Sequence, residues 1–260
     1  MPCKSNIFAQ PSSQAVPLYL IASGDAENWL RAQGSRVQNS ATSQSWNGKL
    51  GQILCVTKNG LPIVVAIGFG DATARSRNRF GAVANIASLP ATIFEILDQS
   101  PETAQDFALG FALSKYQFTR YASSAAPKAE LICPAGVNAQ KLQAIIEGEF
   151  LTRDLINTPA NDMGPDELEA AARDLADEYG AQISVVTGQD LIAQNFPMIH
   201  AVGRASLRAP RLIDMTWGAT GPNLTLVGKG VCFDTGGLNI KPGSSMGLMK
   251  KDMGGAAHVM

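Results

Sequence analysis

Residues 226–257 read LVGKGVCFDTGGLNIKPGSSMGLMKKDMGGAA, and this stretch says most about the fold. It begins with apolar residues typical of a buried strand and continues into glycine-rich loops. In open α/β sheets, sites form in the loops that follow the carboxyl ends of strands. Glycine lets the backbone turn sharply there and approach a ligand closely. The stretch therefore predicts an α/β domain with a site at a strand end.

The chain just upstream alternates strand and helix patterns. A helix begins at Gly164-Pro165-Asp166-Glu167, because proline suits the first helical position and acids favour the positive end of the helix dipole. A shorter helix is expected over QDLIAQNF (189–196). The expected strands are AQISVVTG (181–188), MIHAVGRA (198–205), RLIDMTWG (211–218) and LTLVGKGVCFD (224–234). This alternation predicts an α/β domain with a mostly parallel or mixed sheet.

The first half of the chain shows the same alternation. Helices are expected over 25–33, 77–88 and 102–118. The expected strands are PLYLIASG (17–24), GQILCVT (51–57), LPIVVAIGFG (61–70) and AELICP (129–134), with a turn at Lys58-Asn59-Gly60. A long helical pattern over 139–155 follows, and we place the domain change there. This gives an N-terminal α/β domain over 1–138 and a second α/β part over 139–260.

Composition excludes several classes of protein. Hydrophobic residues make up 45% of the chain and charged residues 17%, which argues against a disordered or fibrous protein. The net charge of −1 provides no strong field for nucleic acid or an anionic membrane. No apolar run is long enough to span a bilayer, and the N-terminus lacks the pattern of a secretory signal. We expect a cytoplasmic protein without a membrane or nucleic-acid partner.

The cysteines and histidines also favour a cytoplasmic protein and limit the ligands that a metal site can use. The cysteines at positions 3, 55, 133 and 232 form no C-x-x-C pair, so reduced thiols in a cytoplasm fit best. Only two histidines occur, His200 and His258, and a metal site must rely on other ligands. His200 lies in an expected apolar strand and is interpreted as a core residue, and His258 as a packing residue.

Four charged residues among the glycines can support metal chemistry. Asp234 and Asp252 lie on adjacent loops, and two carboxylates can hold a divalent cation. Lys229 could ligate a metal as the neutral amine, although deprotonating an ordinary lysine at pH 7 costs about 4–5 kcal/mol. Lys241 would stay protonated and polarise a carbonyl. The structural alternative remains open, because strand-end aspartates commonly cap turns and glycine-flanked lysines are commonly solvated.

Other residues of the stretch have rival interpretations. Gly243-Ser244-Ser245-Met246-Gly247 fits the serine-hydrolase pattern G-x-S-x-G, but Pro242 interrupts the strand that this pattern needs. The P-loop and dinucleotide patterns both fail around Gly228-Lys229-Gly230. Lys250 and Lys251 are interpreted as surface charge. By composition alone, Met246, Met249 and Met253 are interpreted as core filler.

Together, VGKGVCFDTGG, NIKP and LMKKDMGGAA resemble the metal-binding core of the leucine aminopeptidase (cytosol aminopeptidase) family. The intervals between the two lysines and two aspartates match as well. The resemblance continues upstream through RDLINTPANDMGPDELEAAA and FPMIHAVGRASLRAPRLIDMTWG, both typical of bacterial members, and it covers about residues 105–260. The combination is far more specific than any single motif. It implies a variable N-terminal α/β domain followed by the first part of a mixed-sheet catalytic domain.

The resemblance implies a role for each matching residue. Lys229, Asp234 and Asp252 would be metal ligands, with Asp234 bridging two divalent ions, zinc or manganese. Lys241 would be the catalytic lysine, and Met249 would line the pocket for the first side chain of the substrate. The implied reaction is the removal of N-terminal, leucine-like residues from peptides by two-metal hydrolysis.

The resemblance also implies partners. Members of the family are typically hexamers, and a further N-T-D-A-E-G-R motif completes their site and holds a bicarbonate. This chain lacks that motif and reaches Met260 within an expected helix. We therefore expect a longer polypeptide or a second chain to supply the rest, and residues 1–260 alone to bind metal weakly and to show no peptidase activity. A non-catalytic or DNA-binding descendant is the alternative, which a salt-dependent gel shift would reveal.

Overall fold

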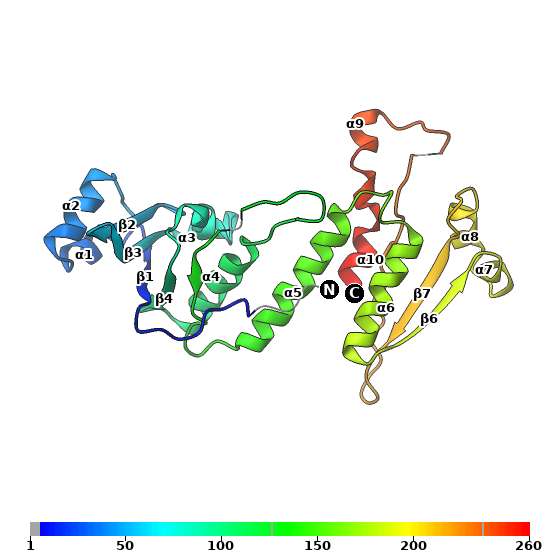
Figure 1. The fold of residues 1–260 in the computed structure, drawn as a ribbon, viewed down its shortest axis with the longest axis horizontal. Coiled ribbons are helices and arrows are strands. Elements are labelled where there is room, and N and C mark those ends of the chain that lie inside the picture. The colour runs from blue at the N-terminus through cyan, green and yellow to red at the C-terminus, as the bar shows by residue number, and fades with distance from the viewer. Residues whose placement is uncertain (1–5, 126, 236) are drawn as a thin grey trace. The chain divides into compact units, whose positions relative to one another are not determined.

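The computed structural model describes residues 6–125, 127–235 and 237–260. The chain divides into two compact units, one up to Glu147 and one from Gly148 (Figure 1). Helix α5 (Ala139–Asn157) contains the point of division. The domain boundary after residue 138 stays a prediction. No helix in the described part of the chain is both long and apolar enough to cross a bilayer.

The first unit is built on a mixed five-stranded sheet with the order β2-β3-β1-β4-β5. Its strands are β1 (Val16–Ala22), β2 (Ile53–Lys58), β3 (Leu61–Gly70), β4 (Ile93–Leu97) and β5 (Glu130–Leu131). β2 and β3 form an antiparallel hairpin, and the other neighbours are parallel. The expected turn is confirmed, because Asn59 and Gly60 have φ values of 55° and 80°, which suit a two-residue hairpin turn.

Four α-helices flank this sheet within the described residues. They are α1 (Ala26–Arg31), α2 (Ser35–Ser43), α3 (Ala72–Arg77) and α4 (Pro101–Leu113). The expected helix over 77–88 is wrong, because α3 ends at Arg77 and two 3₁₀ turns follow at Gly81–Val83 and Ile86–Ser88. Gly81 explains part of this: a Cβ there would lie 2.5 Å from Leu50 Cδ2, so the chain packs closely at this point. β4 and α2 were not expected from the sequence.

A tightly packed aromatic and aliphatic cluster holds α1 and α2 to the sheet. Trp29 lies between Tyr19 and Trp46, with ring centroids 5.5 and 5.7 Å apart. The buried residues of the cluster are Ile21, Ala26, Val37, Ala41, Trp46, Leu54, Val56 and Ala66. Burial of apolar area of this kind is the main source of the unit's stability.

The second unit combines helices with a two-stranded antiparallel sheet of β6 and β7. Its elements are α6 (Pro165–Tyr179), β6 (Gln182–Thr187), α7 (Asp190–Ala193), α8 (Pro197–Gly203), β7 (Arg211–Thr216), α9 (Gly243–Met246), the 3₁₀ helix η3 (Met249–Met253) and α10 (Gly254–Val259). Gly180 ends α6 in the left-handed region at φ 66°, as expected.

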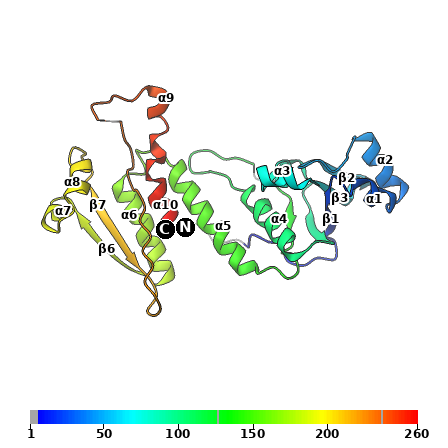
Figure 2. The ribbon, with the colours of Figure 1, turned by 180° about the vertical axis from the view of Figure 1, so that it is seen from behind.

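Helices pack around a small core in this unit. Figures 1 and 2 show α10 beside α6 and the C-terminal end of α5 from opposite sides. The buried core residues there are Leu155, Met163, Leu168, Met253 and Ala257. Thr152 Oγ1 donates a hydrogen bond to the Ala257 carbonyl at 3.0 Å, which adds a buried polar link to the apolar contacts.

Two expected strands of the second unit are wrong. MIHAVGRA forms α8, where Pro197 occupies the start of the helix. LTLVGKGVCFD forms no strand among the described residues. A strand needs a hydrogen-bonded neighbour, and the side chains of Leu224 and Val227 are instead 82% and 88% exposed.

Candidate functional site

Lys229 lies in an irregular segment that is held against helix α10. The Ala256 backbone N–H donates to the Lys229 carbonyl oxygen at 2.8 Å. A Cβ at Gly228 would lie 2.5 Å from the Gly255 carbonyl oxygen, and one at Gly255 would lie 2.8 Å from the Lys229 nitrogen. Only glycines permit this approach. The close contact that the glycines allow is therefore with a helix of the same unit.

Lys229 forms an ion pair with Asp252. The Nζ of Lys229 donates to Oδ2 of Asp252 at 2.7 Å, with the lysine side chain 58% exposed and the aspartate 19%. Asp252 belongs to η3, and the next residue, Met253, is fully buried. The buried methionine anchors η3 and so fixes the carboxylate that Lys229 meets.

Lys241 forms a second ion pair, with Asp234. Its Nζ donates to Oδ2 of Asp234 at 2.6 Å and to the carbonyl oxygen of the same residue at 3.3 Å. The backbone N–H of Lys241 also donates to the Thr235 carbonyl at 3.1 Å. These bonds close the loop that connects the two residues and hold the ammonium group at the carboxylate.

The four candidate residues thus meet in two pairs. Lys229 and Asp252 were both predicted as metal ligands, whereas Lys241 and Asp234 join the predicted catalytic lysine to the predicted bridging carboxylate. Each carboxylate faces an ammonium group, so the local charge of each pair is balanced. The ligand and catalytic roles of these residues stay predictions.

The donor chemistry fits a divalent metal in part. Asp234, Asp252 and the amine of Lys229 would supply oxygen and nitrogen donors of the types that zinc and manganese accept. Within the described ranges, no three His, Cys, Asp or Glu side chains lie close enough together to hold a metal ion. A site built from these residues therefore needs further donors.

The other residues singled out in this stretch have separate positions. Met253 is core filler as expected, but Met249 is only half-buried at the start of η3. Ser245 is exposed on the short helix α9, whose N-cap is Pro242. No strand precedes Ser245 within the described residues, so the local geometry is not that of a nucleophile elbow.

Both histidine interpretations need correction. His200 is half-buried on helix α8 rather than in a core strand, and its Nε2 lies 3.4 Å from Nε2 of Gln189. His258 is exposed on α10, where its Nδ1 lies 2.9 Å from the Gly254 carbonyl oxygen of the same helix. Neither histidine side chain is buried in the core.

Sequence reasoning missed the role of Lys250, which was interpreted as surface charge. Its Nζ donates to the Asn157 carbonyl oxygen at 2.8 Å, at the C-terminal end of α5. A cation there satisfies a terminal carbonyl and complements the helix dipole. Lys250 thereby ties the segment that bears Asp252 to α5. A lysine in a short 3₁₀ helix carries no sequence signal for such a distant contact.

Cys232 lies between Lys229 and Asp234 in the sequence and packs against the core of the unit. Burial raises its pKa to about 11, and the negative charge of Glu167 adds to the shift. Its Sγ lies 3.5 Å from the Gly230 carbonyl oxygen. The thiol is therefore kept protonated and inert at neutral pH, which agrees with a structural role.

Comparison with known protein families finds an N-terminal domain followed by a catalytic domain, the order that the sequence analysis expects. Residues 16–134 match the M17 aminopeptidase N-terminal domain. Residues 150–260 match the catalytic domain of the cytosol aminopeptidase family. Among curated relatives, probable cytosol aminopeptidases from Sinorhizobium fredii and Roseiflexus castenholzii are each 35% identical, over 82% and 83% of this chain. The chain spans about half the length of these relatives, 49% and 50%.

Solved structures agree with the sequence relatives. The crystal structure of cytosol aminopeptidase from Coxiella burnetii is 35% identical, with a TM-score of 0.89 over 98% of this chain and 56% of that protein. The bottromycin maturation enzyme BotP, solved in complex with Mn, is 29% identical, with a TM-score of 0.74 over 95% of this chain and 54% of that one.

Proposed function

We propose, from the premise that this chain belongs to the cytosol aminopeptidase family, that its protein removes N-terminal residues from peptides by metal-dependent hydrolysis. The observation that carries the proposal is the pairing of Lys229 with Asp252 and of Lys241 with Asp234. Each of the two lysines thus lies within hydrogen-bond distance of a carboxylate that the family resemblance assigns to metal binding, which supports a shared site for the metal ligands and the catalytic lysine.

In this proposal, Lys229, Asp234 and Asp252 would hold two divalent ions, zinc or manganese, and Asp234 would serve as a ligand to both. Bound divalent ions lower the pKa of water to near neutrality and polarise a carbonyl group. Lys241 donates hydrogen bonds to the oxyanion that develops on the scissile carbonyl, and Asp234 keeps its ammonium group in place. Met249 contacts the first side chain of the substrate, with a preference for leucine-like residues.

The proposal extends to assembly. A hexamer in the cytoplasm is the expected form, with bicarbonate as a further component of the site. The remaining metal ligands come from a longer polypeptide or from a second chain. The segment with Leu224, Leu226 and Val227 forms no strand in this chain, but its exposed apolar side chains support a further segment that would cover them, because a central strand of a covered sheet is apolar on both faces.

The direct test uses the native protein in its longest natural form. Intact mass, metal content and hydrolysis of a leucine amide substrate are measured for the wild type and three variants. Lys241→Ala is expected to keep the metal and to lose at least about 100-fold in kcat, the scale of one oxyanion donor. Asp252→Asn is expected to lose metal. Lys251→Ala, an exposed neighbour, is the matched control and is expected to change neither.

The outcomes separate the proposed roles. Loss of metal in Lys241→Ala would overturn the division between the two lysines. Full activity of Asp252→Asn with normal metal content would overturn the ligand assignment. Turnover by purified residues 1–260 alone would show that no further segment is needed.

A further inference from the structure

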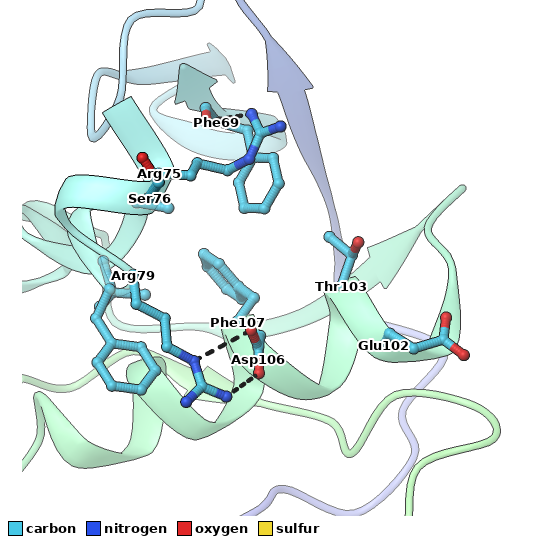
Figure 3. A pocket seen from close by; sticks show the side chains of 11 residues that line it. Phe69, Arg75, Ser76, Arg79, Glu102, Thr103, Asp106 and Phe107 are labelled. Atoms are coloured by element: carbon cyan, nitrogen blue, oxygen red, sulfur yellow. Dashed lines mark hydrogen bonds and ion pairs between the residues drawn. The ribbon is translucent and has the colours of Figure 1, made fainter. Parts of the chain in front are cut away.

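A cavity of about 530 Å³ lies in the first unit, and none of the residues that line it belongs to the lysine–aspartate pairs. One wall runs from Phe69, near the end of β3, to Val83, and the other is the start of helix α4, which follows β4 (Figure 3). β1 lies between β3 and β4 and is parallel to both, so their carboxyl ends share one edge of the sheet. Ligands of open α/β sheets bind outside this edge, and the volume suits a small molecule.

Arg75 is held rigidly on the first wall. Its Nη1 donates to the carbonyl oxygens of Phe69 and Gly70 at 3.1 and 3.0 Å. The guanidinium carbon lies 4.6 Å from the centroid of the Phe69 ring. No carboxylate within the described ranges pairs with Arg75, and its Nε and Nη2 have no protein acceptor there. The group is therefore a preorganised cation with donors to spare.

The charged groups around Arg75 leave it unopposed. Arg79 is bound by Asp106 through two hydrogen bonds, of 2.6 and 3.2 Å, so these two charges balance each other. Glu102 is exposed, and Figure 3 shows its carboxylate pointing away from both arginines. Arg75 is therefore the lining arginine that no carboxylate pairs with among the described residues, whereas the formal charges of the whole lining, Glu102 included, sum to zero.

The remaining lining combines the hydroxyls of Ser76 and Thr103 with an apolar surface, and the Ser76 hydroxyl donates to the Thr73 carbonyl oxygen at 2.9 Å. Thr103 lies on the first turn of α4, and its Oγ1 already accepts from the Ser100 hydroxyl at 3.3 Å, so its own proton is available to a ligand. The ring of Phe107 and the side chains of Ala82 and Val83 are buried and close the cavity on the inner side. Contact between this surface and an apolar group of a ligand removes apolar area from water, which makes the free energy of binding more favourable.

We propose that this cavity binds a small anion with an apolar body. Arg75 and Thr103 hold the carboxylate or phosphate group of the ligand, and the rings of Phe69 and Phe107 contact its body. The site needs neither metal nor the second unit, and it stands independently of the proposed peptidase activity.

Calorimetric titration of the full chain with defined probes tests this proposal. Phenylacetate and phenyl phosphate are compared with benzyl alcohol and benzylamine, which lack the anion, and with inorganic phosphate, which lacks the apolar body. A chelator is present throughout to exclude binding to metal. At least one of the two aromatic anions is expected to bind at least tenfold tighter than every control, and their order identifies the preferred anionic group.

Variants then assign the residues. Arg75→Gln is expected to weaken binding at least tenfold, and Thr103→Val several-fold. Arg77→Gln, on the same helix but outside the cavity, is the matched control and is expected to bind normally. Arg75 also donates to two backbone carbonyl oxygens, so its replacement can unfold the protein. In that case the affinity of Thr103→Val for the probes decides the proposal. Equal binding of benzyl alcohol, no binding of either aromatic anion, or unchanged affinity in folded variants of both residues would overturn the proposal.

Discussion

The backbone N–H of Ala256 donates to the carbonyl oxygen of Lys229 at 2.8 Å. This bond joins Lys229, a predicted metal ligand, to helix α10, which begins two residues after the predicted ligand Asp252. The contact exists because Gly228 and Gly255 leave no side chain between the two backbones. A Cβ at Gly228 would also lie 2.6 Å from Ala256 Cα. The position of Lys229 thus depends on the absence of two methyl groups.

Gly228→Ala is expected to lower the free energy of unfolding by about 2 kcal/mol, because backbone atoms must shift to admit the methyl group. Urea unfolding followed by circular dichroism measures the change. Gly243→Ala is the matched control, since nothing lies within 4 Å of a Cβ there. Equal stability of the two variants would show that the Lys229 segment is not held against α10.

Arg211 is expected to be the most important ion-pairing residue of the second unit. Its side chain is 10% exposed and pairs with Glu169 and Asp166 on α6, which ties β7 to that helix. Arg211→Met removes the buried one of the two arginines that pair with Glu169 and also removes the partner of Asp166, and it is expected to cost about 2–3 kcal/mol. Arg173→Met removes a 47%-exposed partner of the same Glu169 and is expected to cost less than about 1 kcal/mol. Equal costs in urea unfolding would contradict this ranking.

Stability is also expected to depend on pH through Glu169. Burial raises the pKa of this carboxyl, but hydrogen bonds and charges from Arg211 and Arg173 outweigh burial and lower it below the ordinary value of 4.5. The stability that ionised Glu169 contributes is therefore present above pH 4.5 and is lost as the pH falls through the folded-state pKa. Unfolding is measured from pH 7 to pH 3 for the wild type and Glu169→Gln. The variant should lose less stability over this range, and parallel curves would contradict the assignment.

Local signals explain which elements could be predicted. Asn59-Gly60 specifies a hairpin turn through its own backbone preferences, and Pro165 with Gly180 marks the two ends of α6, so both features were confirmed. MIHAVGRA was assigned wrongly because a short apolar run fits a strand or a helix equally. Pro197 was the neglected signal, since it suits the first turn of α8.

Long-range contacts explain what could not be predicted. The segment from Leu224 to Asp234 has the composition of a strand, but a strand forms only beside a neighbour, and residues far apart in the sequence can supply that neighbour. Motif spacing selected the two lysines and two aspartates, yet it could not say which lysine meets which aspartate. That pairing is fixed by the contact of Gly228 with α10 and by the buried Met253, both of which are tertiary.

Cys232 is expected to react slowly with alkylating reagents in the folded chain. With a pKa of about 11, only about one thiol in a thousand is ionised at pH 8. At the ordinary value of 9.0, about one in ten would be. Iodoacetamide labelling at pH 8, followed by peptide mass mapping, should therefore proceed about 100-fold more slowly at Cys232 in buffer than in urea. A rate that urea leaves unchanged would mean that the thiol is not buried against the core beside Lys229, and the position of the whole segment would need revision.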